Sequence, residues 1–166
     1  MKKRIGILTG GGDVPPLNGV IAAAAAEAGS LGVELIGFVR GWQGVLENDW
    51  VSLSAREVPS RVGGTILKSS RVNIEKMGGG PERAIRNLEK LGVSGLIVIG
   101  GEDTLSNAFL FGSFPQALIS KTIDNDVGAT GAPGSAFEPE KILNYFTLGF
   151  PTAAEKIISF VSLAEG

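Results

Sequence analysis

The sequence contains no cysteine and no histidine among its 166 residues. The lack of cysteine excludes a disulfide framework and a thiol nucleophile, and the lack of histidine excludes Ser-His catalysis and the usual zinc sites. Any general base in this chain must therefore be Asp, Glu, Lys or Tyr. A bound metal must be a hard cation held by oxygen atoms, and Mg²⁺ is the first expectation.

The sequence also lacks a long apolar run and an excess of either charge. No stretch approaches the roughly 20 apolar residues that span a bilayer, and no signal-peptide core follows the basic first residues. Lys and Arg number 15 against 17 Asp and Glu, so no basic surface for nucleic acid is expected. We therefore expect a cytoplasmic protein that binds neither a membrane nor a nucleic acid. A hydrophobic content of 43% fits one domain with its own core.

Glycine, in contrast, is abundant and clustered. Ten of the 25 glycines gather at 10–12, 63–64, 78–80 and 100–101. Clusters at the ends of structural elements favour a close approach of the backbone to a ligand.

Short apolar runs alternate with helical patterns along the chain. Strands are expected at 4–8, 33–39, 95–99 and 117–119, and helices after Pro15-Pro16, after Pro81 and after Gly101. Gly29 is the expected C-cap of the first helix. The stretch 40–58 is irregular, with Trp42 and Trp50 expected to pack rather than bind. This alternation predicts a Rossmann-like three-layer α/β fold with a mainly parallel sheet.

The segment 121–126, Lys-Thr-Ile-Asp-Asn-Asp, carries two carboxylates beside a lysine. If the run before it is a strand, the carboxylates emerge at its C-terminal end, where open parallel sheets place their ligands. In an extended segment, Asp124 and Asp126 would share one face. Such a face suits a metal, a phosphate and a proton acceptor together. For the carboxylate pair alone, a polar loop that caps a helix is the alternative.

Two other segments have the composition of anion sites. The loop 9–13 stands between a strand and a helix, although it is neither a Walker A sequence nor a G-x-G-x-x-G. In 61–71, two glycines, three hydroxyls and two cations make an oxyanion cradle: Gly63, Gly64, Thr65, Ser69, Ser70, Lys68 and Arg71. The alternative for 9–13 is a tight strand-to-helix turn, and the alternative for 61–71 is a solvated loop.

Five stretches stand in the same order, and at similar separations, as motifs of the 6-phosphofructokinase family. They are Gly11-Gly12-Asp13, Gly63-Gly64-Thr65 with Arg71, Gly100-Gly101-Glu102-Asp103-Thr104, the segment 121–126, and the stretch 147–153. The chain resembles the family over about residues 3–160. The resemblance implies phosphoryl transfer to the 1-hydroxyl of fructose 6-phosphate in glycolysis, which gives fructose 1,6-bisphosphate. ATP is the donor in one branch of the family and pyrophosphate in another.

The resemblance also implies individual roles. Asp124 would accept the proton of the sugar hydroxyl, and Asp126 would support the metal or the transferring phosphoryl group. Thr122 would contact the sugar phosphate, and Glu102 would bind Mg²⁺. The residues expected to hold the donor phosphates are Gly11, Arg71, Gly101, Asp103, Thr104 and Lys121.

Asp103 and Lys121 discriminate between the donors. ATP-dependent members of the family have glycine at both positions, which leaves room for the nucleotide. Here the two side chains fill that space and place an ammonium against the donor phosphate, so the resemblance favours pyrophosphate, with ATP as the alternative. We also expect the pair to act as one unit, because an aspartate and a lysine at the same site can neutralise each other.

The chain departs from the family pattern in several places. Pro16 and Ser120 replace a glycine and a proline that are usual there, and 128–145 is a longer connection, expected to be a lid or an insertion. The family's second half does not follow. We therefore expect residues 1–166 to be an N-terminal phosphate-donor-binding domain of a homo-oligomer. The alternatives are an inactive half-domain that binds phosphate or nucleotide and associates with a partner, and a generic dinucleotide binder, which the missing G-x-G-x-x-G disfavours.

Overall fold

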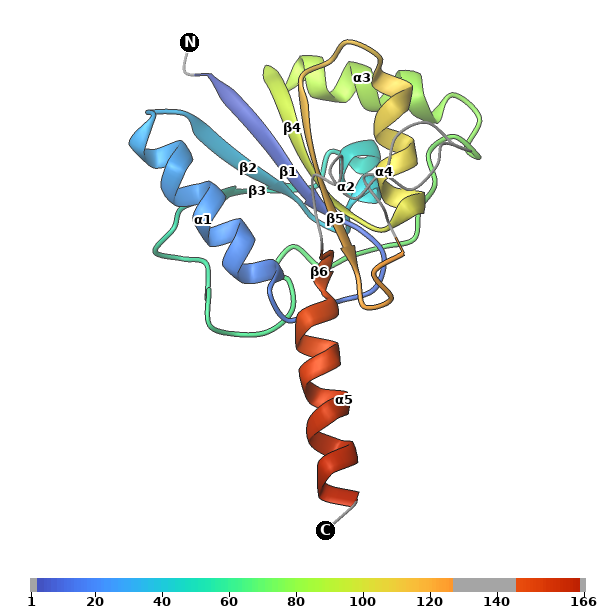
Figure 1. Ribbon diagram of the computed structural model, residues 1–166. Coiled ribbons are helices and arrows are strands. Elements are labelled where there is room, and N and C mark those ends of the chain that lie inside the picture. Colours follow the sequence, from blue (N-terminus) through green and yellow to red (C-terminus); the bar gives the residue numbers. More distant parts are fainter. Residues whose placement is uncertain (1–2, 127–145, 165–166) are drawn as a thin grey trace.

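The computed structural model describes residues 3–126 and 146–164, which form a six-stranded sheet with helices on both faces (Figure 1). The strands are β1 (Arg4–Thr9), β2 (Glu34–Phe38), β3 (Trp50–Leu53), β4 (Val93–Gly100), β5 (Gln116–Thr122) and β6 (Leu148–Gly149). The helices are α1 (Leu17–Ser30), α2 (Trp42–Glu47), α3 (Gly80–Lys90), α4 (Glu102–Ala108), the 3-10 turn η1 (Phe109–Phe111) and α5 (Phe150–Ala164). The predicted lid at 128–145 lies outside the described residues. Within the described ranges, no helix has the length and apolar character to cross a membrane.

The sheet is mainly parallel, as predicted. β1 pairs in parallel with β2 on one side and β4 on the other, and β4, β5 and β6 continue in the same direction. β3 alone runs antiparallel, along the outer edge of β2. The central strands are apolar on both sides because helices cover both faces of the sheet.

Two apolar clusters confirm the three layers. On one face, α1 packs its Leu17, Ile21 and Ala25 against Ile7 and Ile99 of the sheet. On the other face, α2, α3 and α4 cover the sheet around a second cluster (Figure 1). Its members include Leu8, Phe38, Trp42, Val45, Leu88, Leu96, Val98, Leu105 and Phe111.

In the strand order β3-β2-β1-β4-β5-β6, the chain first adds strands on one side of β1 and later adds strands on its other side. The chain leaves β1 through α1 toward β2 on one side, and later returns through α3 to β4 on the other side. The loops that follow β1 and β4 therefore separate, and a crevice opens between them at the carboxyl ends of the strands. Ligands of open α/β sheets bind at such a crossover point.

Three local features differ from the sequence-based expectation. α1 runs past Gly29 to Ser30, and the glycine that follows it in a left-handed conformation is Gly32, with φ of 65°; the predicted C-cap at Gly29 is wrong. The stretch 40–58 contains α2 and β3, which the sequence did not reveal. α2 is less than two turns long and β3 is a short, half-exposed edge strand, so neither carries a periodic apolar pattern.

Trp42 packs, as expected, inside the cluster beneath α2. Its ring stacks on Phe111 at a centroid distance of 5.2 Å, and its Nε1 donates a hydrogen bond of 2.9 Å to the carbonyl of Thr104. The indole therefore joins α2 to α4 and η1.

The loop 61–71 is tied to α1 by one buried side chain. Asn18 is 2% exposed, its Nδ2 donates to the carbonyl of Val62 at 3.0 Å, and its Oδ1 accepts from the N–H of Ile66 at 2.8 Å. The backbone N–H of Asn18 also donates to the carbonyl of Gly64 at 2.9 Å. This amide holds the loop that carries Arg71.

We expect Asn18→Ala to lower the free energy of unfolding by about 1–3 kcal/mol, because the loop loses two hydrogen bonds to a buried side chain. Urea unfolding of the chain measures the change. The control is Ser30→Ala, which removes an exposed hydroxyl bond to Glu27 and should cost less than about 0.5 kcal/mol. An equally small loss in both variants would show that Asn18 does not anchor the loop.

Candidate active site

A cavity of about 500 Å³ lies at the crossover point, where the loops after β1, β4 and β5 converge. The loop 61–71 contributes one further wall. The lining residues are Gly11, Gly12, Asp13, Val14, Arg71, Gly101, Glu102, Asp103, Lys121, Thr122, Ile123 and Asp124. Segments distant in the sequence thus meet because parallel strands end at one edge of the sheet.

The cavity brings together eight of the ten residues singled out from the sequence. They are Gly11, Arg71, Gly101, Glu102, Asp103, Lys121, Thr122 and Asp124. Thr104 and Asp126 do not line it. Four separate segments therefore converge on one cavity, as the predicted site requires. The role of each residue stays a prediction.

Thr104 lies behind the cavity rather than in it. Its side chain is buried against Gly10 and Gly100, and a Cβ atom on either glycine would overlap it. Gly10 also donates its N–H to the carbonyl of Ile99 at 2.9 Å. Thr104 therefore packs the loops after β1 and β4 together. The sequence shows the two glycines, but it does not show that the Thr104 side chain occupies the space where their Cβ atoms would lie.

Lys121 is the buried cation of the site. Its residue is 4% exposed, and its Nζ donates to the carbonyl of Gly12. The ammonium also lies 3.2 Å from the position that a Cβ on Gly11 would take, at a left-handed φ of 76°. Burial lowers the pKa of Lys121 below its ordinary value, the negative charge of Asp13 raises this pKa, and the positive charge of Arg71 lowers it.

The acid that acts on Lys121 is Asp13, and this corrects the expected pairing with Asp103. In the described part of the chain, Asp103 and Lys121 form no ion pair. The backbone carbonyl of Asp103 instead accepts from the side chains of Ser106 and Asn107. Asp13 belongs to the glycine loop after β1. It is the only acid of that loop, and this was the sequence signal that could have indicated its position beside Lys121.

Arg71 reaches the cavity because the preceding residues are fixed to the sheet. The carbonyl of Ser70 accepts the N–H of Gly11 at 3.1 Å, and the Ser70 hydroxyl donates to the carbonyl of Arg40 at 2.7 Å. Arg40 in turn donates its N–H to the carbonyl of Leu67 at 2.7 Å. The segment 67–71 is thus held between the ends of β1 and β2.

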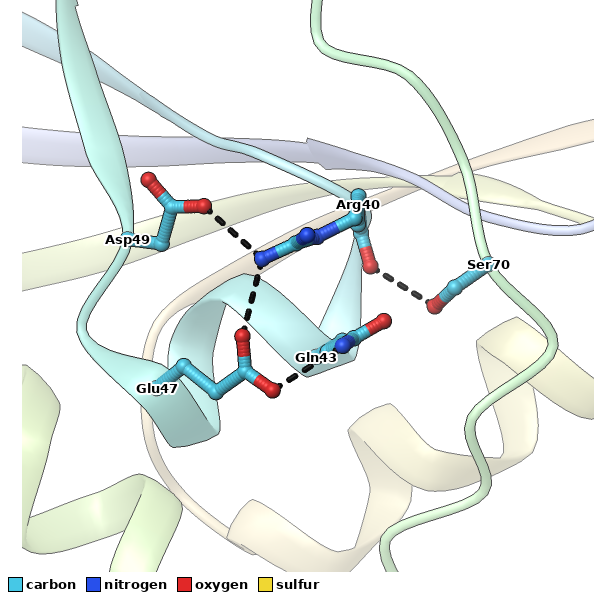
Figure 2. Close-up of polar contacts among 5 residues, drawn as sticks. All are labelled: Arg40, Gln43, Glu47, Asp49 and Ser70. Atoms are coloured by element: carbon cyan, nitrogen blue, oxygen red, sulfur yellow. Dashed lines mark hydrogen bonds and ion pairs between the residues drawn. The ribbon is translucent and has the colours of Figure 1, made fainter.

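Arg40 supports this segment from an unusual backbone conformation, with φ of 64°. Its guanidinium bonds the carboxylates of Glu47 at 2.8 Å and Asp49 at 3.0 Å, while its carbonyl meets Ser70 (Figure 2). The carboxylates come from α2 and from the turn before β3, two elements that the sequence analysis missed.

Much of the predicted oxyanion cradle serves the fold instead. The Thr65 hydroxyl lies 3.1 Å from that of Thr9, and the Ser70 hydroxyl is bound to Arg40. Of the cradle residues, only Arg71 lines the cavity.

The segment after β5 bends, which changes the relation of its two carboxylates. β5 ends at Thr122, and Asn125 has a left-handed φ of 55°. The extended segment, on which the shared face of Asp124 and Asp126 depended, is not formed, and only Asp124 lines the cavity. The Thr122 hydroxyl accepts the N–H of Asp124 at 3.1 Å and lies 3.3 Å from its Oδ2.

The acids of the cavity do not form a metal cage by themselves. Among residues 3–126 and 146–164, no three acidic side chains are close enough to hold an ion. Mg²⁺, however, usually binds one or two carboxylates together with waters and substrate phosphates. Glu102 and Asp103, side by side at the start of α4 on the cavity wall, fit that kind of site.

Comparison with known proteins identifies relatives with two donor specificities. A family described as "Phosphofructokinase" matches residues 4–164. The chain is 40% identical to "Pyrophosphate--fructose 6-phosphate 1-phosphotransferase" of Dictyoglomus thermophilum, over 96% of this chain and 43% of the relative. It is 45% identical to "ATP-dependent 6-phosphofructokinase" of Aquifex aeolicus, over 76% of this chain and 41% of the relative. The chain thus spans about two-fifths of these relatives, the larger share being 43%.

Solved structures show the same fold. Pichia pastoris phosphofructokinase in the T-state superimposes with a TM-score of 0.79 at 24% identity, over 97% of this chain and 18% of that one. The Saccharomyces cerevisiae phosphofructokinase gives 0.80 at 23% identity, over 99% of this chain and 24% of that one. These structures support the Rossmann-like α/β arrangement.

Because the pKa of Lys121 is lowered, the free energy of unfolding of the chain changes with pH in the alkaline range. Between this lowered pKa and the ordinary value of 10.5, the unfolded chain binds more protons than the folded one, so the free energy of unfolding rises with pH. We expect Lys121→Met to lose this rise, measured by urea unfolding from neutral pH upward. Lys90→Met, at an exposed position in α3, should keep it. Parallel pH curves for the wild type and Lys121→Met would contradict the assignment.

Proposed function

The chain belongs to the phosphofructokinase family, and on this premise we propose that it supplies the donor-binding and catalytic part of an enzyme that transfers a phosphoryl group from pyrophosphate to fructose 6-phosphate. The phosphoryl group would go to the 1-hydroxyl and give fructose 1,6-bisphosphate. The observation that carries the proposal is the single cavity that joins Lys121 and Arg71 to Asp124.

The cations of the cavity suit a diphosphate. Arg71 offers a planar fork of donors, and Lys121 offers a point charge, the two ways in which proteins commonly bind phosphate. Phosphoryl transfer needs positioning and charge neutralisation more than covalent chemistry. Gly11 and Gly101 on the cavity wall have no side chain, so the backbone after β1 and β4 would approach a bound donor closely at these two positions.

The choice of pyrophosphate depends on Asp103 and Lys121. Both line the cavity, and the Lys121 ammonium lies against the glycine loop, beside Gly11 and the Gly12 carbonyl. This arrangement supports the choice of pyrophosphate, because the two side chains would leave less room for a nucleotide and the ammonium would lie beside a compact donor. ATP is the alternative donor, favoured by the 45% identity to a relative named as ATP-dependent.

Asp124 is the proposed general base. It is exposed to the cavity, and its N–H and Oδ2 are both near the Thr122 hydroxyl, so its carboxylate is oriented while it stays accessible to a sugar hydroxyl. Thr122 is the proposed contact to the sugar phosphate. Asp126 does not line the cavity. In this proposal it would support the metal or the transferring phosphoryl group from beside the cavity.

Glu102 is the proposed protein ligand of Mg²⁺, with the donor phosphates and waters as the other ligands. The ion would neutralise charge on the phosphates during transfer. Thr104 would serve the donor site by packing the two glycine loops. The cytoplasm as location and a homo-oligomer as assembly are proposals that rest on the family alone.

Asp124→Asn should lower kcat by roughly 10²-fold or more in the active enzyme that contains this chain. The affinity for the donor should change little, because the amide keeps the shape of the side chain and the donor cations remain. Steady-state kinetics with both substrates measure kcat and KM. The control is Glu89→Gln, at an exposed acid of α3. A variant that turns over at nearly the wild-type rate would remove Asp124 from this role.

The donor assignment is tested by Asp103→Gly with Lys121→Gly, measured as kcat/KM for pyrophosphate and for ATP. We expect the ratio to move toward ATP by roughly tenfold or more, equivalent to about 1.4 kcal/mol, because the double change opens the cavity and removes the buried cation. Lys121→Gly alone should weaken pyrophosphate binding most, and Lys90→Gly should leave the ratio unchanged. If the parent enzyme already prefers ATP, the alternative donor replaces pyrophosphate in the proposal.

A further inference from the structure

Thr147 joins the two sides of the bend that carries Asp124. It stands immediately before β6 and is 3% exposed. Its hydroxyl donates to the carbonyl of Thr122 at 2.6 Å, and its backbone N–H donates to Oδ1 of Asn125 at 2.8 Å. The same hydroxyl lies 3.3 Å from Oδ1 of Asn125. One buried residue from a distant part of the chain therefore binds the residues before and after the segment 123–124.

The two central residues of the bend are exposed. Ile123 is 55% exposed and Asp124 is also exposed, so no buried apolar side chain holds these two residues in place. Sheet pairing ends just before them, with Thr122 opposite Gly149 of β6. Among the described residues, the polar contacts that bear on the direction of the Asp124 carboxylate include those of the Thr122 hydroxyl and those that Thr147 makes to Thr122 and Asn125.

We propose that Thr147 is a positioning residue for the reaction, which clamps Thr122 and Asn125 and thereby directs the Asp124 carboxylate into the cavity. This inference rests on the proposed function of Asp124. Thr147 does not itself line the cavity, and its printed contacts are to Thr122 and Asn125, so it acts through the bend. A displacement of about 1 Å in a reacting group can cost roughly 10²-fold in rate, which makes such a clamp consequential for turnover.

The chemistry of the side chain allows a clean test. Thr147→Val keeps the shape and the backbone N–H but replaces the hydroxyl by a methyl group, so the carbonyl of Thr122 loses its side-chain donor. Thr147→Ser keeps the hydroxyl and loses only a methyl group. Asn125→Gly removes the other end of the clamp, and glycine tolerates the left-handed φ of 55° at that position.

In the active enzyme, we expect Thr147→Val and Asn125→Gly each to lower kcat by roughly tenfold or more, with the KM for pyrophosphate within about twofold, because Arg71 and Lys121 do not depend on the bend. Thr147→Ser should restore kcat to near the wild-type value. In the background of Asp124→Asn, adding Thr147→Val should cost little more, because residues that act as one unit are not additive. Hydrogen exchange of the amides in 122–126 should accelerate in Thr147→Val while the amides of β1 and β4 stay protected.

Several results would overturn the inference. They are a Thr147→Val enzyme with wild-type kcat, a full additional loss in the Asp124→Asn background, or a rise in KM and a loss of protection that extend through the whole fold. Should Thr147→Val fail to fold, Asn125→Gly and Thr147→Ser carry the same test. An enzyme that transfers no phosphoryl group to fructose 6-phosphate from either donor would instead disprove the proposed function, and the hydrogen-exchange measurement would still decide whether the clamp exists.

Discussion

The reversal of strand order at β1 is the constraint on which the site depends. Because the connections from β1 and into β4 leave on opposite faces of the sheet, the loops after these strands diverge and leave a crevice that helices do not fill. The loops still have to pack against each other at their base. Thr104 does this between Gly10 and Gly100, where no side chain other than hydrogen fits. The cavity and the packing below it are therefore two consequences of one topology.

Electrostatics gives this crevice its specificity. An ammonium that is 4% exposed is unfavourable unless polar groups surround it, and Lys121 meets that need with the carbonyl of Gly12 and the charge of Asp13. Arg71 opposes it. A bound diphosphate would reverse this balance by adding negative charge beside both cations. In the proposed function, the chain would hold a destabilised cation in place before a donor binds, which is the preorganisation that phosphoryl transfer requires.

The bend after β5 shows how a site residue is aimed without a hydrophobic core around it. Asp124 is exposed, as the proposed general base has to be, so burial cannot hold it. The structure instead buries Thr147 and uses its hydrogen bonds to Thr122 and Asn125. Similar support precedes Arg71, where the Ser70 carbonyl accepts the N–H of Gly11 and the Ser70 hydroxyl donates to the carbonyl of Arg40, the latter bond being drawn in Figure 2. In both places the supporting contacts are polar and come from residues next to the proposed site residue in space rather than from that residue itself.

The sequence by itself determined the alternation of strands and helices, the mainly parallel sheet and the residue types at the strand ends, because apolar runs and glycine clusters are local signals. It also indicated most of the cavity residues, from Gly11 to Asp124. Tertiary structure decided what local signals cannot encode. Lys121 faces Asp13 rather than Asp103 because β5 ends across from the loop after β1, which sequence spacing does not reveal. Asp126 leaves the cavity wall because a left-handed Asn125, bound to Thr147 just before β6, breaks the extended geometry on which a period of two depends.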